Sequence, residues 1–215
     1  MTDARLFSIQ VGRVAPLGPQ GVSSGFVKHP VAGRVEVARL GLTGDEQADL
    51  SVHGGPEKAV YGYAAAHYPA WAADFPELAS NFVSGALGEN LTIGDMTEAD
   101  IRPGDVHAIG TARLQVCQPR QPCFKLALRF GDNRLAKAMV RTGRSGWYYR
   151  VLQTGGLRAG DPVLLVERPH PDFAFERLVE IVYRGNAMRA ELETLADMPA
   201  LASNLRAVAR RALNR

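Results

Sequence analysis

Cysteine, long apolar runs and a secretory leader are scarce or missing in this chain. Only Cys117 and Cys123 occur among its 215 residues, with five residues between them. That spacing makes a poor disulfide framework, so we expect free thiols in a reducing, cytoplasmic setting. No apolar run approaches the roughly 18 residues that span a bilayer, and the N-terminal MTDARLFSIQVG lacks the apolar centre of a secretory signal. These absences predict a soluble protein without a membrane partner.

A strong excess of one charge is also missing. The net charge is +3 and the isoelectric point is about 9.0. This balance argues against a dedicated nucleic-acid binder, but it suits a ligand that carries phosphate. A C-terminal cluster of arginines without intervening acids indicates either a partner or nucleic-acid face or, more commonly, a solvated helix face. Its members are Arg206, Arg210, Arg211 and Arg215.

Turn-forming residues are plentiful, with 22 glycines and 13 prolines, as folds built from short strands require. We expect strands at 6–14, at 31–40 and repeatedly between 85 and 167, and one or two short helices over 59–75. After the break RPHPD at 168–172, apolar residues recur at helical spacing. The sequence therefore predicts a mainly β fold with α elements (α+β). A barrel-like domain would occupy residues 1–168 and a module of three short helices residues 170–215, with Asp172 and Asp197 as helix N-caps.

Both cysteines lie in one stretch, LQVCQPRQPCFKL at residues 114–126. It begins as an alternating strand and breaks at two prolines, which leaves Cys123 on a stiff loop between Arg120 and Lys125. Neighbouring cations favour the thiolate, the form that acts as a nucleophile and binds soft metals. The residues alone do not separate this role from that of a buried cysteine serving as a small hydrophobe. Cys117 lies within the expected strand, has no adjacent cation and is expected to be structural.

Polar, glycine-rich segments supply further candidates. The segment GLTGDEQADLSVHGG at 41–55 is longer than a hairpin turn requires, and long structured loops are commonly functional. Asp49 and His53 could perform acid–base chemistry, and the glycines after His53 could cradle a phosphate together with Lys58. Ordinary turn and cap chemistry explains the same residues equally well. Other candidates for ligand contacts are Asn90 in GEN and the cations Lys28 and Arg34.

Taken in order along the chain, these stretches resemble the MOSC domain, a family named for the C-terminal domain of molybdenum cofactor sulfurases. The resemblance rests on GDEQADLSVHGG, on KAVYGY just after it, on GENL and on QVCQPRQPCFKL. It extends from about Lys28 to Glu167. The helical tail is similar to the three-helix module of the stand-alone bacterial YiiM-type members, so the resemblance covers nearly the whole chain.

The resemblance implies a molybdenum cofactor, in which molybdopterin carries the metal. Family members place one cysteine on the molybdenum; Cys123 in QPRQPC matches that position, whereas Cys117 matches no family ligand. The implied activity is reduction of N-hydroxylated compounds, including amidoximes and bases such as 6-hydroxylaminopurine. Candidates for the phosphate and pterin side are Lys28, Arg34, Lys58, Arg120 and Lys125, and candidates for the pocket wall are His53, Asp49 and Asn90.

The resemblance also bears on partners. The sequence contains neither a stretch resembling the pyridoxal-phosphate desulfurase part of complete sulfurases nor a CxxxxCxxC cluster. We therefore expect electrons to come from a separate reductase, a flavin or iron–sulfur protein. An alternative is a non-catalytic module that carries cofactor or sulfur on Cys123. A third hypothesis, a nucleic-acid-binding regulator acting through the terminal helix, fits the modest net charge poorly. The oligomeric state is not predicted.

Overall fold

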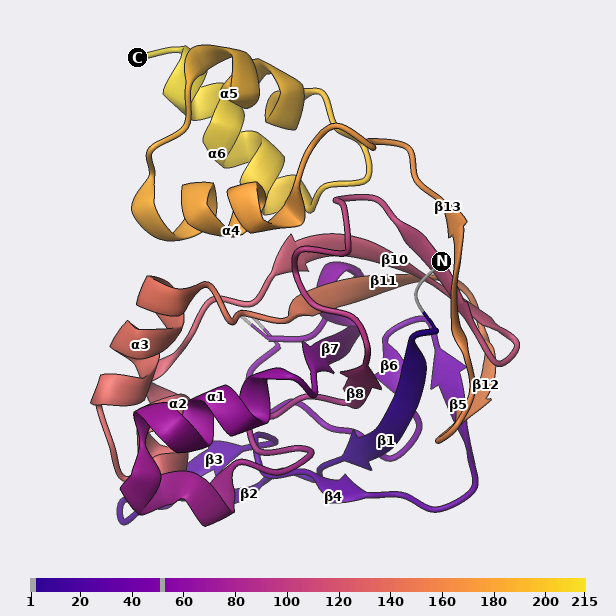
Figure 1. Cartoon of the computed structure of the whole chain (residues 1–215), viewed down its shortest axis with the longest axis vertical. Helices are drawn as coiled ribbons and strands as arrows, with labels where there is room; N and C mark the ends of the chain where they lie inside the picture. The colour runs from indigo at the N-terminus through magenta and orange to yellow at the C-terminus, as the bar shows by residue number, and fades with distance from the viewer. Residues whose placement is uncertain (1–2, 51–52) are drawn as a thin grey trace.

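The computed structural model describes residues 3–50 and 53–215, and it contains one large sheet, two small sheets and two groups of helices (Figure 1). The large sheet has eight strands in the order β13-β9-β10-β11-β7-β8-β1-β4. Strands β7 and β8 pair in parallel, and the other neighbours are antiparallel. Its strands are β1 (Arg5–Val11), β4 (His29–Pro30), β7 (Val60–Ala64), β8 (Leu91–Gly94), β9 (Val106–Ile109), β10 (Ala112–Pro119), β11 (Trp147–Gln153) and β13 (Val163–Glu167). The small sheets contain β12 (Gly155–Arg158), β5 (Arg34–Ala38) and β6 (Gly41–Leu42) and, separately, β2 (Ala15–Leu17) and β3 (Val22–Ser24).

The large sheet curls toward closure but does not form a closed barrel. Strand β1 reaches the residues before β13 through the isolated bridge Arg5–Pro162 and the Leu6 N–H to Asp161 O hydrogen bond of 2.9 Å. Pro162 has no N–H to donate, so the pairing is interrupted at this residue. It resumes on both sides, where the Val163 N–H donates to the Ala4 oxygen at 2.8 Å and the Gly160 N–H donates to the Leu6 oxygen at 2.7 Å. The prediction of a mainly β fold with helices is confirmed, and its barrel-like part is a strongly curled sheet in which β1 contacts the residues around the start of β13 without regular closure.

The helices form one group beside the sheet and one at the C-terminus. They are η1 (Pro56–Lys58), α1 (His67–Asp74), η2 (Pro76–Asn81), α2 (Phe124–Phe130), α3 (Arg134–Thr142), α4 (Phe175–Arg184), α5 (Arg189–Ala196) and α6 (Ser203–Leu213), with η marking 3-10 helices. The prediction of helix over 59–75 was wrong for its first part, because Val60–Ala64 is strand β7. Every residue of β7 is buried, and a strand covered on both faces loses the alternation that marks a strand in the sequence. Within the described residues no helix is long and apolar enough to cross a membrane.

The three C-terminal helices occur as predicted, but their caps differ. The N-cap of α4 is Ala174 rather than Asp172, and Asp197 ends α5 while Ala202 begins α6. The N-terminus of α6 is held from outside: the Glu57 carboxylate accepts the Ser203 N–H at 2.9 Å and the Ser203 hydroxyl at 2.8 Å. These contacts tie the helices to η1, which lies next to the cavity described below. The division into domains at 168 and 170 stays a prediction.

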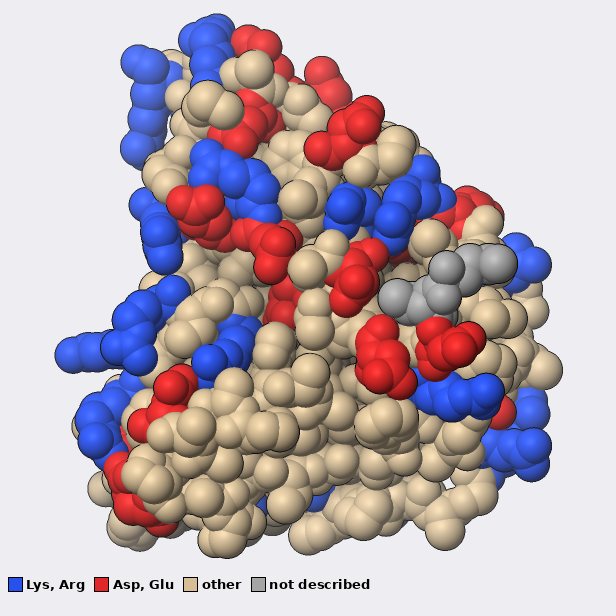
Figure 2. All heavy atoms as spheres, viewed as in Figure 1, with Lys and Arg blue, Asp and Glu red and all other residues tan. Residues whose placement is uncertain are grey.

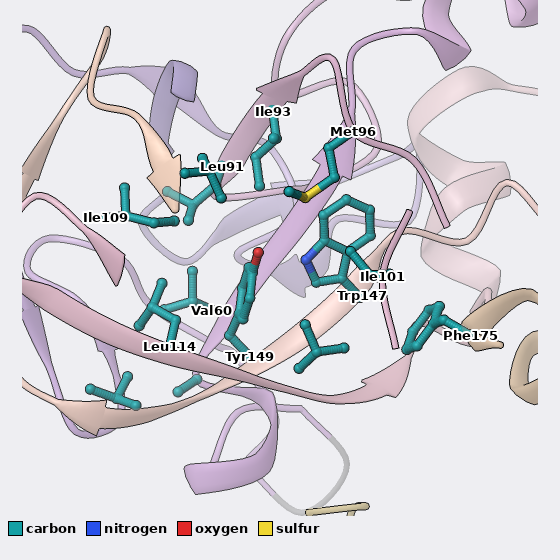
Figure 3. Close-up of a cluster of buried hydrophobic side chains, with 14 of the residues drawn as sticks. Val60, Leu91, Ile93, Met96, Ile101, Ile109, Leu114, Trp147, Tyr149 and Phe175 are labelled. Atoms are coloured by element: carbon teal, nitrogen blue, oxygen red, sulfur yellow. The ribbon is translucent and has the colours of Figure 1, made fainter. Parts of the chain in front are cut away.

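Two hydrophobic clusters support the fold. The larger one fills the sheet and continues into α4; Figure 3 shows Trp147 and Tyr149 among Leu91, Ile93 and Phe175. The second cluster gathers aromatic side chains beneath α1, η2 and α2, including Phe82 and Phe130, whose rings stack at 5.2 Å between centroids. Leu126 and Phe130 anchor α2 in this cluster. The N-cap of α2, Cys123, therefore precedes a helix that is firmly packed against the core.

Acid sensitivity is expected from one buried histidine. His107 on β9 is 1% exposed, and its Nδ1 lies 2.8 Å from the Tyr149 hydroxyl. Burial lowers the pKa of His107 from 6.5 to about 4, although the Asp105 carboxylate opposes the change. The unfolded chain then binds a proton at a higher pH than the folded chain does. We expect this histidine to leave the free energy of unfolding unchanged above pH 6.5 and to lower it progressively toward pH 4, by up to about 3 kcal/mol.

Urea unfolding at pH 7.0, 5.5 and 4.5 tests this expectation when His107→Gln is compared with the wild type. The wild type should lose stability with falling pH more steeply than the variant, because other titrating groups are common to both proteins. Equal slopes would show that His107 is not the group responsible.

Candidate functional site

A cavity of about 120 Å³ opens beside the end of β10, and seven of the nine site residues predicted from the sequence line it. Its walls come from segments far apart in the chain, so the fold assembles them. Four cationic side chains face two carboxylates, those of Asp45 and Glu46, which leaves an excess of positive charge. Such a cavity suits an anionic ligand. The predicted residues in its lining are Lys28, His53, Lys58, Asn90, Arg120, Cys123 and Lys125; other lining residues include Phe26, Tyr61, Gln118 and Tyr148.

Cys123 lies where strand changes to helix. Strand β10 ends at Pro119 and α2 begins at Phe124, with Cys123 as its N-cap in an extended conformation (φ −119°, ψ 167°). The ring of Pro122 removes a backbone donor just before Cys123. This loss delays the start of the helix until after Pro122. The Cys123 side chain is partly exposed and free of any disulfide. The prediction of a presented thiol on the proline loop therefore agrees with its position in the cavity wall.

The environment of Cys123 favours its thiolate. Burial alone would raise the pKa of this thiol, but a hydrogen bond with His53, the charge of Arg120 and the backbone amide of Lys125 together lower it to about 7. Near neutral pH about half of the thiol is therefore ionised. A thiolate of this kind is the form that binds soft metals and attacks electrophiles.

Alkylation rates test this pKa without any ligand. We expect the iodoacetamide reaction of Cys123 to reach half its maximal rate near pH 7 and to shift to higher pH in His53→Ala, because that variant removes a donor to the thiolate. Cys117 should stay unreactive, since burial raises the pKa of its thiol to about 12. Mass spectrometry of tryptic peptides resolves the two sites. A Cys123 midpoint near that of an ordinary cysteine, roughly 8.5, would contradict the expectation.

Arg120 brings a buried positive charge to the cavity. The residue is 5% exposed, and its guanidinium carbon lies 5.3 Å from the centre of the Phe26 ring and 5.1 Å from that of Tyr61. Its backbone oxygen accepts the Tyr183 hydroxyl at 2.5 Å, which fixes the loop. Among the residues that the structure describes, its buried Nη1 has no hydrogen-bond partner. Because a buried unpaired donor is costly, this atom indicates that an anionic or carbonyl oxygen of a ligand completes the site.

A buried ion pair also lines the cavity. Lys28 pairs with Asp45, and their side chains are 7% and 1% exposed. Burial lowers the pKa of Lys28, although Asp45 opposes the change. Asp45 also accepts the Gly12 N–H at 2.8 Å and the Asn90 amide at 2.9 Å. The Asn90 amide oxygen meanwhile accepts the Tyr61 N–H at 3.1 Å, so Asn90 positions Asp45 and β7 and has little capacity left for a ligand.

Comparison with known proteins agrees with this geometry. Residues 49–164, more than half of the chain, match the family model of the MOSC domain. The chain belongs to the MOSC domain family. The Escherichia coli (strain K12) protein YiiM is 44% identical over 150 residues, which cover 70% of this MOSC chain and 67% of that protein.

Two further relatives of this MOSC protein extend the likeness. The crystal structure of YiiM from Geobacillus stearothermophilus superposes with a TM-score of 0.83 at 34% identity, covering 98% of this chain and 99% of that one. A protein of Gibberella moniliformis (strain M3125 / FGSC 7600) named "Reductase" is 37% identical over 197 residues, which cover 90% of this chain. They cover 35% of that protein, so this chain spans about a third of its length.

Two residues predicted for the site of this MOSC protein do not line the cavity. Arg34 lies on β5, where its side chain is 53% exposed, pairs with Glu36 at 3.2 Å and donates to the Thr111 hydroxyl at 2.8 Å. Asp49 is exposed, and its backbone oxygen accepts the His53 N–H at 2.9 Å. The sequence alone could not place a β5 side chain relative to a cavity built from other segments.

Cys117 is buried in β10, as expected for a structural residue. Its thiol donates to the backbone oxygen of Glu57 at 3.0 Å. The fully buried position keeps it from the cavity, whose lining contains the neighbouring Gln118 instead.

The sequence did not select several residues that the MOSC cavity uses. Asp45 belonged to a segment already noted as polar, yet only the fold shows that it faces Lys28 and Asn90. Tyr148 lies in a strand with three consecutive aromatic residues. Nothing in the sequence shows which of them lines the cavity and which pack in the core. Glu89 is fully buried and accepts the N–H groups of Gly85 at 2.6 Å and Leu87 at 3.0 Å, which holds the GEN turn that carries Asn90.

Proposed function

We propose that this MOSC protein binds a molybdenum cofactor and reduces N-hydroxylated compounds, such as 6-hydroxylaminopurine and amidoximes. The observation that carries the proposal is a thiol with a pKa near 7 beside a buried guanidinium with an unused donor. The name "Reductase" of the Gibberella relative points in the same direction. Both cysteines are free thiols, and we keep the cytoplasm as the proposed location.

The cavity residues fit such a cofactor in their chemistry. A thiolate is the soft ligand that molybdenum accepts, and Cys123 would provide it. The unused Nη1 of Arg120 could donate a hydrogen bond to a phosphate or pterin oxygen. A charge-assisted hydrogen bond to such a group is stronger than one between neutral groups. Lys28, Lys58 and Lys125 would add positive charge within the same cavity. Burial lowers the pKa of Lys58, so its ammonium gains from an anionic partner.

The bound molybdenum would supply the two-electron redox chemistry. The balanced reaction is R–NHOH plus two electrons and two protons giving R–NH₂ and water. The protein residues would hold the cofactor and orient its ligands. His53 holds Cys123 through a hydrogen bond, and Tyr183 holds the Arg120 backbone. Asn90 acts through Asp45 rather than on a ligand, and Arg34 and Asp49 have no part in the proposed contacts.

Turnover by protein purified from a host that makes the cofactor tests the proposal. With reduced methyl viologen as the electron source, we expect conversion of 6-hydroxylaminopurine to adenine and of benzamidoxime to benzamidine. Apoprotein from a host lacking the cofactor is the control and should be inactive. Protein that contains molybdenum but reduces neither substrate would contradict the proposed activity.

A second function is a non-catalytic carrier of sulfur or cofactor. The partly exposed, readily ionised Cys123 favours it, because such a thiol can also hold a persulfide. A carrier would transfer labelled sulfur from Cys123 to an acceptor protein and would not turn over a hydroxylamine. The viologen assay therefore separates the two functions.

A further inference from the structure

A second and larger hollow, of about 450 Å³, lies between the C-terminal end of α3 and helix α4. Its lining residues include His67, Glu98, Arg141 and Arg184. Figure 2 shows the surface drawn inward at the left edge, between the levels at which Figure 1 places α4 and α3. Neither the family resemblance nor the proposed chemistry uses this hollow.

Unpaired positive charge borders the hollow. Helix α3 carries Arg134, Lys137 and Arg141 and no acid. Their spacing of three and then four residues puts them on one helix face. Arg134 is neutralised by Glu77 and Asp132, whereas Lys137 and Arg141 are exposed and make no ion pair with any described residue. Figure 2 shows basic side chains projecting at this edge. Lys137, Arg141 and Arg184 with the adjoining hollow are called the basic groove.

The acids of the groove are mostly engaged. Glu98 is 4% exposed, lies 2.6 Å from His67 and accepts the Gly146 N–H at 2.6 Å. Glu180 pairs with Arg177 at 2.6 Å and with Arg184 at 3.7 Å. Only Glu176 is exposed without an ion pair among the described residues. Arg184 reaches across the groove, where its Nη2 donates to the Arg141 backbone oxygen at 3.5 Å. Among the described residues, the exposed side chains without an ion pair at this edge are Lys137, Arg141 and Glu176, so the uncompensated charge is positive.

The groove and the cofactor cavity share a thin wall. Tyr183 lines the groove and donates its hydroxyl to the backbone oxygen of Arg120, whose residue lines the cavity. Tyr61 lines the cavity and donates to the Ser145 backbone oxygen at 2.8 Å, next to Arg144 of the groove. One layer of side chains thus separates the two spaces. Electrons can cross such a layer, whereas a substrate cannot.

We propose that the basic groove docks an acidic electron-donor protein, a flavin or iron–sulfur protein, which reduces the cofactor through the Tyr183–Arg120 wall. The inference rests on the proposed function for its purpose, since that reaction needs two electrons from outside. Charge complementarity steers such encounters and sets their partners. The groove and the cofactor cavity have no lining residue in common, so donor and substrate need not compete for the same residues.

A plant-type [2Fe–2S] ferredoxin, a strongly acidic protein, is the probe. Its oxidised form is titrated calorimetrically into the full-length protein at low ionic strength. We expect wild-type binding to weaken with added NaCl, and the variant Lys137→Glu/Arg141→Glu to bind at least about tenfold more weakly, because two attractions become repulsions. Both residues are exposed and unpaired, so the variant should fold; its melting curve checks this. Arg184→Glu is a second variant with the same expected direction. Arg211→Glu/Arg215→Glu makes the same charge change at the end of α6 and just beyond it, and should bind as the wild type does.

Turnover separates this inference from the proposed function. The groove variants should lose ferredoxin-driven turnover and keep viologen-driven turnover, because the small donor does not need the groove. Failure of viologen-driven turnover in every protein contradicts the proposed function, while the binding titration still decides about the groove. Equal ferredoxin binding by groove and control variants, or no binding by the wild type, overturns the docking proposal. So does tighter binding of a single-stranded DNA oligonucleotide than of ferredoxin, lost in the same variants, because that result assigns the groove to nucleic acid.

Discussion

The variant Cys123→Ser is expected to lose more than about 100-fold in viologen-driven reduction of 6-hydroxylaminopurine. Loss of an outer partner of a metal ligand already costs roughly 10- to 100-fold, and this variant replaces the ligand itself. A serine oxygen is harder than sulfur and hardly ionises near neutral pH, so it is a poor ligand for a metal that prefers thiolate. The thiol that it replaces has a pKa of about 7, lowered against burial by His53 and Arg120.

Cys117→Ser is the matched control for this substitution. Cys117 donates to the Glu57 backbone oxygen, and a serine hydroxyl can make the same hydrogen bond from the same strand. We expect this variant to retain most of the wild-type rate at 25 °C. The assignment fails if Cys123→Ser keeps the wild-type rate, or if both serine variants lose activity to the same extent.

The second large effect concerns stability. Asp45→Ala is expected to lower the free energy of unfolding by about 3–5 kcal/mol, the usual cost of removing one partner of a buried ion pair. The variant leaves the Lys28 ammonium, whose side chain is 7% exposed, without its carboxylate. It also leaves the Gly12 N–H and one Asn90 amide hydrogen without their acceptor. Chemical unfolding at pH 7 measures the change.

Glu46→Ala is the neighbouring control. Glu46 pairs with Arg13 at the surface, where the two side chains are 44% and 81% exposed, so its loss should cost no more than about 1 kcal/mol. Adding Lys28→Met to Asp45→Ala should recover part of the lost stability, because the unpaired charge is then gone. If Asp45→Ala costs no more than Glu46→Ala, the buried pair does not stabilise the fold as described.

The position of the thiol was accessible from the sequence because its signals are local. Two prolines and two flanking cations distinguished Cys123 from Cys117, and both residues lie where that pattern predicted. The three C-terminal helices were accessible for a similar reason, since their apolar residues recur at helical spacing. Their caps were not, because α6 is capped from outside by Glu57, a residue 146 positions earlier in the chain.

The remainder of the site depends on contacts between distant segments. Nothing in the local sequence around Asp45 shows that Lys28 and Asn90 converge on it. Arg34 carried the same local signal as Lys28, but β5 places it on an exposed sheet away from the cavity lining. The strand β7 was mistaken for helix because burial on both faces removes periodicity. The position of each of these residues and of β7 depends on which distant segments it contacts. A single sequence does not state those contacts.

X-ray absorption at the molybdenum edge tests the central claim, that Cys123 is the metal ligand. The measurement compares the loaded wild type with Cys117→Ser and Cys123→Ser, at equal molybdenum content. We predict that the number of sulfur neighbours around molybdenum is the same in the wild type and Cys117→Ser, and lower by one in Cys123→Ser. An unchanged sulfur count in Cys123→Ser would contradict the account.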